Sequence, residues 1–555
     1  MTPTVSESER GPVSLRLGAE WLEDPVDPVA GAEAFVRDPR IPRADHVVVF
    51  GAGLGYRLAN LDAQGVAPVV FEPCPEVLEL ARRHGPGIPE GTQVFTDPNA
   101  FYGHLLSVSK PDQNTLLLCP PPYRRAFPEA FEHLSRRIAE VQGMAILRRN
   151  SIADRAAPMA EQAVRNLSRV SGLRSASDVG GALAGTPAFI VSAGPSLDKN
   201  RHLLAEAGRR GAIFTVNTAA PAVAAAGAPI DLLVAIEVLD VSKAITMAAP
   251  HIRALALDIT SGGANYDVAI EPKIVFGPDT QAFRPLLDDL GVAPLGYGGS
   301  VATAAFSLAA ALGADPIVMV GQDLAYPNGR AYATDTLFDA TTVSREGDLL
   351  IIQRAAAWEE ITRAGGLRVP SKARPCVDVP AWGGGTVPST HELVSFLRWF
   401  EHAARELRGR VELIDATEGG AAMEGYVERT LEDVIASLPV RAHALHERIA
   451  AAPRLGQVPP RRAAALVAAG SRRLARAALR SGEALRRRDA RALQKANKAL
   501  RSAAEGARLA EGHASGALAR VLADEALDPF ERERRTYDVI RESAERVCRL
   551  ARSIR

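Results

Sequence analysis

Polar residues that could bind a nucleotide follow apolar, strand-length segments in the middle of the chain. The segment Ala188–Ser192 is apolar and partly β-branched, and the turn Ala193–Leu197 (AGPSL) comes directly after it. Ser196 and Asp198 are candidate N-caps of a following helix. Because helix N-termini offer free N–H groups and a positive dipole end, this turn could bind phosphate. A strand-to-helix turn that needs glycine only for its backbone angles is the alternative.

Other polar residues stand at comparable positions. Asn217, Glu237, Gln322 and Asp323 each follow a strand-length apolar segment, and a second glycine turn, Gly298–Ser300, opens an alanine-rich helix. The carboxyl ends of parallel strands share one edge of a sheet, where open α/β sheets bind their ligands. We therefore expect one crevice with N–H donors for phosphate and polar groups for ribose and base.

Strand and helix signals alternate from about residue 180 to 425, which predicts a parallel sheet with helices on both faces. The six strand candidates are Phe189–Ser192, Ala212–Val216, Leu232–Ile236, Ala254–Leu257, Ile274–Phe276 and Ile317–Gly321. We assign residues 179–430 to a central, doubly wound α/β domain.

An earlier βαβ pattern predicts a Rossmann-like N-terminal domain, residues 1–150, after an irregular lead-in of about 40 residues. The buried-strand segment His46–Phe50 runs into the glycine turn Gly51–Gly55, and a second strand, Val69–Phe71, ends at Glu72. That carboxylate could accept ribose hydroxyls. The turn could hold a nucleotide or S-adenosylmethionine, or it could be purely structural.

The remaining segments are helical in pattern. Two helical stretches, 128–143 and 152–170, precede the central domain, and we assign 151–178 to a helical linker. Residues 431–555 are rich in Ala, Arg and Leu without strand patterns, which predicts a helical C-terminal bundle.

Charge is unevenly distributed, although 65 basic and 65 acidic residues balance over the whole chain. Residues 441–555 hold 26 Lys/Arg against 13 Asp/Glu. Such a tail suits an acidic partner, or is a solvated helical face. Aromatic residues for base stacking are nearly absent from it, so we expect no nucleic acid partner.

Composition excludes several classes of protein. The four cysteines lie far apart without a CxxC pair, so neither a zinc site nor a disulfide framework is indicated. The opening residues are polar, and the longest apolar runs are too short to cross a bilayer. We expect a cytoplasmic protein with no membrane insertion.

Several motifs together resemble the motility-associated factor (Maf) flagellin glycosyltransferases. They are the AGPSL turn, Gly321–Tyr326 (GQDLAY), Asp415–Ala421 (DATEGGA) and the N-terminal Phe50–Leu58 (FGAGLGYRL). The family's central, MptE-like domain is in turn similar to bacterial sialyltransferases that use CMP-activated sugars. The resemblance implies a Rossmann-like N-terminal domain, a sialyltransferase-like central domain and a helical C-terminal domain.

The resemblance also implies roles for residues. Gly194, Pro195 and Ser196 would form the donor turn, and Asn217 would contact nucleotide phosphate or ribose. Gln322 is assigned to the same donor site.

Gly299 and Ser300 would lie near the donor carboxylate, while Asp323 and Tyr326 would line the nucleotide end. Glu237 is a further possible residue of the site, and capping is its alternative role.

The implied reaction is an inverting transfer of a pseudaminic- or legionaminic-type sugar from CMP to Ser/Thr of flagellin. It needs a base for the acceptor hydroxyl and charge stabilisation for departing CMP, without an obligatory metal. Relatives have a histidine a few residues after GQDLAY, where this chain has Tyr332. His391 is the remaining candidate base, beside Asp323 and Tyr326 as catalytic residues; an exposed or capping role is its alternative.

Three other functions remain open. The central domain also resembles an archaeal hydroxymethylpterin diphosphokinase, which would use ATP with Mg²⁺. A methyltransferase would bind S-adenosylmethionine at Gly51–Glu72. A non-enzymatic flagellar assembly factor would use the basic tail to hold an acidic filament protein.

Overall fold

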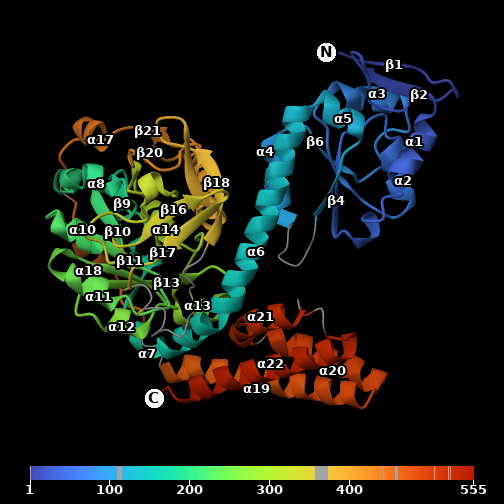
Figure 1. Ribbon diagram of the computed structural model, residues 1–555. Coiled ribbons are helices and arrows are strands. Elements are labelled where there is room, and N and C mark those ends of the chain that lie inside the picture. The colour runs from blue at the N-terminus through green and yellow to red at the C-terminus, as the bar shows by residue number, and fades with distance from the viewer. Residues whose placement is uncertain are drawn as a thin grey trace. The chain divides into compact units, whose positions relative to one another are not determined.

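The computed structural model of the chain divides into two compact units, residues 1–149 and 150–555 (Figure 1). The structure describes residues 2–108, 115–356, 360, 373–441, 443–456, 460–505, 507–522, 524 and 527–554.

The first unit contains the predicted parallel sheet, with strand order β6-β5-β4-β7. The buried valines of β4 pair in register with β5 on one side and β7 on the other. The elements are β4 (His46–Phe50), α2 (Tyr56–Ala63), β5 (Val69–Phe71), α3 (Glu76–His84), β6 (Gln93–Phe95), α4 (Pro98–Val108), β7 (Thr115–Leu118) and α5 (Pro121–Ala126).

The prediction of an irregular lead-in is wrong. Residues 3–21 form a three-stranded antiparallel sheet, β1 (Pro3–Glu7), β2 (Val13–Leu17) and β3 (Glu20–Trp21), and α1 (Pro28–Phe35) and a short 3-10 helix, η1 (Ile41–Arg43), follow it. Leu15 and Leu17 alternate with polar residues and are buried. The strands are too short and too charged for this alternation to stand out in the sequence.

The two helical stretches expected at 128–143 and 152–170 belong largely to one helix. α6 runs without interruption from Pro128 to Arg165, and the short α7 (Leu167–Val170) follows.

The second unit is built on a ten-stranded sheet, ordered β14-β13-β12-β11-β10-β9-β15-β20-β21, with β8 also paired to β13. Every pair in it is parallel. Its strands are β8 (Arg174–Ser175), β9 (Ala188–Val191), β10 (Ala212–Val216), β11 (Leu232–Ala235), β12 (Leu255–Asp258), β13 (Lys273–Pro278), β14 (Ala293–Leu295), β15 (Ile317–Val320), β20 (Leu413–Asp415) and β21 (Val427–Glu428).

Helices cover both faces of this sheet (Figure 1). Phe189 and Val191 of β9 belong to one core, shared with the C-terminal helices, and Ala188 and Ile190 belong to the other. The helices are η2 (Ala176–Val179), α8 (Leu197–Asn200), η3 (Arg201–Leu203), α9 (Leu204–Ala207), α10 (Ala220–Ala225), α11 (Ser242–Met247), η4 (Ala249–His251), α12 (Gly263–Asp267), α13 (Arg284–Leu290) and α14 (Val301–Ala311). The predicted α/β class is confirmed.

The order in which strands are added to the sheet reverses at β9, although all strands stay parallel. From β9 the strands follow one another outward to β14, and β15 and β20 then pair on the opposite side of β9. Open α/β sheets bind ligands at this switch point, outside the carboxyl ends of the strands.

In the chain, the segment between β15 and β20 forms a separate antiparallel sheet that was not predicted from the sequence. It consists of β16 (Thr342–Glu346), β17 (Leu349–Gln353), β18 (Ala373–Pro380) and β19 (Thr386–Thr390), after the short η5 (Pro327–Gly329). β19 leads directly into α16 (His391–Leu407).

The predicted C-terminal helical region is confirmed. Two short helices, α17 (Leu431–Ser437) and α18 (Leu445–Ala451), precede four long ones, α19 (Pro460–Arg486), α20 (Ala490–Glu505), α21 (Arg508–Leu522) and α22 (Pro529–Arg552). α19 packs between α20 and α22, and it also contacts α7 and α13. Among the described residues, no helix is both long and apolar enough to cross a membrane.

Candidate functional site

The turn after β9 contacts the end of β15 at the switch point. Asp323 accepts hydrogen bonds from the Ser196 hydroxyl (2.6 Å) and from the Ser196 main-chain N–H (3.2 and 3.3 Å). A side chain at Gly194 would place its Cβ 2.0 Å from Asp323 Oδ2, so only glycine fits. Pro195 completes the turn and accepts from the Asp198 amide (3.3 Å). The Ser196 N–H, expected to meet a phosphate, therefore meets a carboxylate of the protein.

The DATEGGA segment is hydrogen-bonded to the GQDLAY segment at the end of β15. The Gln322 amide donates to Thr417 Oγ1 (3.2 Å), and the Ala421 amide donates to the Asp323 carbonyl (2.7 Å). Ser192 Oγ donates to Gln322 Oε1 (2.5 Å). The structure thus brings the AGPSL, GQDLAY and DATEGGA motifs into direct contact.

Two buried carboxyl groups lie at this edge. Burial raises the pKa of Asp323 to about 6, although the Ser196 hydrogen bonds and the Lys199 charge lower it. Burial raises the pKa of Asp415 to about 7, and the charges of Glu428 and Asp323 add to the rise. Asp415 Oδ1 accepts from Thr417 N (3.0 Å), but Oδ2 is buried without a hydrogen-bond partner among the described residues.

Asn217 follows β10, the neighbour of β9 on its other side. Its side chain is 3% exposed, and Oδ1 has no hydrogen-bond partner in the described part of the chain. Buried amide oxygens are rarely left unpaired in folded proteins. An unpaired oxygen beside the switch point is the feature expected of a side chain that binds a ligand.

Two tyrosines lie close together after β15. Burial raises the pKa of both Tyr326 and Tyr332, and the charges of Tyr326 and Glu392 add to the rise at Tyr332, whereas that of Arg354 opposes it. Tyr326 is hydrogen-bonded to the side chain of Thr390, and its amide donates to the Pro388 carbonyl (2.8 Å). The antiparallel sheet therefore places its β19 edge against the GQDLAY segment.

His391 is the first residue of α16, directly after Thr390, and it is half-buried. Within the described residues, no hydrogen bond is recorded between His391 and Asp323 or Tyr326, so its role as base stays a prediction. Tyr332 was noted in the sequence only because relatives have a histidine at its position. In the structure, Tyr332 lies near Tyr326.

Glu237 follows β11 and is half-buried. Its carbonyl accepts from the Gly262 amide (2.8 Å) and Ser261 Oγ (3.1 Å). Tyr332 and Tyr297 are buried, which raises their pKa values, and the charge of Glu237 adds to the rise. Glu237 therefore lies near Tyr297 and Tyr332.

The second glycine turn caps α14. Ser300 Oγ accepts from Thr303 N (3.3 Å), while the Gly298 and Ser300 amides donate to Thr303 Oγ1 (3.0 and 3.3 Å). Gly299 has φ +90°, which favours glycine. In the described part of the chain, no hydrogen bond links Gly299 or Ser300 to the Asp323 network.

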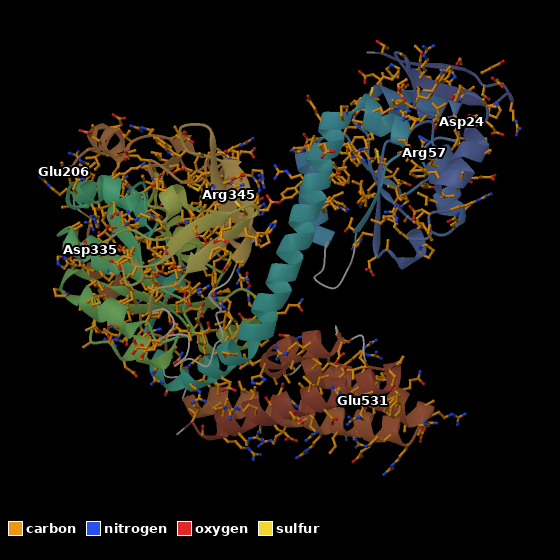
Figure 2. All side chains as sticks on the ribbon, viewed as in Figure 1. Asp24, Arg57, Glu206, Asp335, Arg345 and Glu531 are labelled. Atoms are coloured by element: carbon orange, nitrogen blue, oxygen red, sulfur yellow. The ribbon has the colours of Figure 1, made fainter. Side chains whose placement is uncertain are left out.

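The N-terminal glycine turn is filled by the protein's own side chains. The Ala52 amide donates to Glu72 Oε2 (2.7 Å), the Gly53 amide to the Tyr123 hydroxyl (3.0 Å), and the Leu54 amide to Glu23 Oε1 (2.9 Å). Arg57, labelled in Figure 2, lies 3.8 Å from the same Glu23 oxygen. These amides are the groups that would bind a phosphate, so the structural interpretation of this turn is favoured.

The comparisons with known proteins concern both the central domain and the whole chain. Residues 161–329 match the family model described as 6-hydroxymethylpterin diphosphokinase MptE-like. The structure of a MAf glycosyltransferase from Magnetospirillum magneticum AMB-1 is similar over 99% of this chain and 91% of that one, with a TM-score of 0.50 and 15% identity. The chain has the Maf fold.

No curated protein sequence matches the chain. The resemblance inferred from the motifs is confirmed for the MptE-like domain and for the Maf fold. The MptE-like match runs from the end of α6 to η5, so it includes Gly194, Asn217, Asp323 and Tyr326.

Proposed function

We propose that the chain is a protein O-glycosyltransferase of the Maf type. It would transfer a nonulosonic acid, pseudaminic or legionaminic in type, from a CMP-activated donor to Ser/Thr of flagellin in the cytoplasm. The observation that carries the proposal is the buried, unpaired amide oxygen of Asn217 beside the switch point of a Maf-like sheet. A cytidine nucleotide supplies the amino, hydroxyl and phosphate groups that such an edge can bind.

The roles of the site residues follow from their surroundings. Asn217 would bind the nucleotide, and the network of Gly194, Ser196 and Asp323 would hold the turn beside it. Tyr326 and Tyr332 remain protonated because burial raises their pKa values, so their hydroxyls can donate to the oxygens of departing CMP.

The roles proposed for His391 and for the Gly299–Ser300 turn rest mainly on where these residues stand in the chain. His391 follows Thr390, which bonds Tyr326, so it stands at the edge where an acceptor hydroxyl would enter and would take its proton. Gly299 and Ser300 would face the sugar from the start of α14.

Calorimetric titration with CMP tests the proposal. We expect metal-independent binding by the wild type and at least a tenfold loss in Asn217→Ala. Asn497→Ala, which removes an amide from α20, is the matched control and should bind as the wild type does. Unchanged CMP binding in Asn217→Ala would contradict the assignment.

A diphosphokinase is the second candidate, because the family model matching 161–329 is described by that activity. It would bind ATP only with Mg²⁺ and would leave CMP unbound in the same titration. No response to CMP, ATP with Mg²⁺ or S-adenosylmethionine would instead favour the assembly factor.

A further inference from the structure

The four long C-terminal helices divide sharply by charge. Residues 460–505, which form α19 and α20, hold 13 Lys/Arg against three Asp/Glu. Residues 508–552, which form α21 and α22, hold nine of each. Ten of the tail's 13 net positive charges therefore lie in the α19–α20 hairpin.

The two halves also differ in how their charges are paired. On α22, Arg534 and Arg535 bind Glu531, labelled in Figure 2, and Arg541 binds Glu545. Within the described part of α19, α20 and their connection, no ion pair is recorded for a basic side chain. These side chains are Arg462, Arg472, Arg473, Arg476, Arg480, Arg486, Arg487, Arg488, Arg491, Lys495, Lys498 and Arg501.

The unpaired cations lie in rows. Arg473, Arg476 and Arg480 are exposed and follow one another at spacings of three and four, which places them on one face of α19. Exposed Glu483 comes next on this face, and exposed Arg487 follows directly after the end of the helix. The opposite face, including Leu474, is buried against α20 and α22. At 1.5 Å per residue, the row from Arg473 to Arg480 extends along about 10 Å of α19.

On α20, Arg491, Lys495 and Lys498 repeat at spacings of four and three and are also exposed. Like charges at such spacings repel one another, and the three acidic residues of the hairpin are too few to relieve this repulsion as the acidic residues of α22 do. A partner that carries carboxylates would supply them.

We propose that the α19–α20 hairpin docks an acidic α-helical segment of the acceptor protein. Carboxylates at three- and four-residue spacings on a helix would face the arginine row at matching intervals. Leu466 and Leu479 are exposed on α19 (51% and 44%), and they give the apolar contacts that a protein helix uses.

Nucleic acids and anionic membranes fit this surface less well than an acidic helix. Residues 460–505 contain no aromatic side chain, so bases have nothing to stack on. Two exposed leucines among twelve cations are too few to anchor a membrane-inserted face.

The proposal rests on the proposed function only in identifying the partner as the acceptor. Binding is therefore measured first without turnover. A fluorescein-labelled 28-residue helical peptide of Glu, Ala and Leu is titrated with the full chain, beside its Gln counterpart, a 20-base-pair DNA duplex and phosphatidylglycerol vesicles.

The test variant is the triple change Arg473→Gln, Arg476→Gln, Arg480→Gln. Its matched control removes three charges from α22, by Arg534→Gln, Arg535→Gln, Arg549→Gln. We expect the wild type to bind the Glu peptide at least tenfold more tightly than the Gln peptide, with a tenfold loss in the α19 variant and less than twofold in the control.

With flagellin as acceptor, the α19 variant should raise the acceptor KM about tenfold and leave kcat and the donor KM unchanged. An equal loss in the α22 control, tighter binding of duplex or vesicles than of the Glu peptide, or no binding of that peptide would each overturn the proposal. Absence of sugar transfer with peptide binding intact would count against the proposed function alone.

Discussion

Replacing Asp323 with asparagine should make the protein less sensitive to pH. The folded state raises the pKa of this carboxyl to about 6 from an ordinary value of 3.8, chiefly through burial. Well below pH 3.8 the carboxyl is protonated in both the folded and the unfolded chain, so it does not change the free energy of unfolding. As the pH rises through 4 to 6, the unfolded chain releases the proton more readily, so stability is lost.

The size of the effect follows from the shift. A difference of about two pKa units corresponds to roughly 3 kcal/mol of unfolding free energy lost between pH 4 and pH 7. Asparagine is nearly isosteric, and its Oδ1 can still accept from Ser196. We expect the difference in unfolding free energy, Asp323→Asn minus wild type, to become more positive by 2–3 kcal/mol over that range, as an order of magnitude.

Urea denaturation at half-unit pH steps measures this difference directly. Asp198→Asn is the control of opposite sign: burial acts to raise the pKa of Asp198, but hydrogen bonds from Thr334 and Arg330 outweigh it and lower the value. Its carboxylate stabilises above pH 4, so that variant should lose stability relative to wild type as the pH rises. Parallel curves for Asp323→Asn and wild type would refute the reasoning.

Three further predictions concern other contacts. Gly194→Ala should cost more than 2 kcal/mol of stability in urea denaturation, because its Cβ would overlap Asp323, whereas Gly296→Ala, with nothing within 4 Å, should cost less than 1. Tyr123→Phe removes hydrogen bonds to buried Glu72 and the Gly53 amide and should cost about 1–3 kcal/mol; a loss below 0.5 would contradict the filled turn. Tyr326→Phe should lower kcat for sugar transfer about 10²-fold or more with a smaller change in donor KM, and an unchanged kcat would remove Tyr326 from the chemistry.

The central sheet could be predicted because buried parallel strands appear as continuous apolar runs. β10 was predicted residue for residue, and five more of the ten strands to within one or two residues. The other four strands, β8, β14, β20 and β21, have only two or three residues each and were not predicted. The convergence of the AGPSL and GQDLAY motifs also followed from the rule that parallel strands share a carboxyl edge.

Contacts across long sequence distances could not be predicted. The N-terminal glycine turn looks open in sequence, but Glu23 and Tyr123, 31 and 70 positions from their partners, fill it. The β16–β19 sheet also escaped prediction, because β16, β17 and β18 each bury only one side chain, and two of the three buried residues of β19 are polar. Tyr332 lies near Tyr326 although η5 separates the two residues in the chain, and no local pattern indicates this proximity.

The most direct test of the proposed function is intact-mass spectrometry of flagellin incubated with the purified chain and a CMP-activated pseudaminic or legionaminic acid. The proposal predicts flagellin carrying one or more added sugar residues, with equimolar release of CMP and a large loss of product in Asn217→Ala. Unmodified flagellin with both donors, together with diphosphate transfer from ATP and Mg²⁺ to a hydroxymethylpterin, would contradict it.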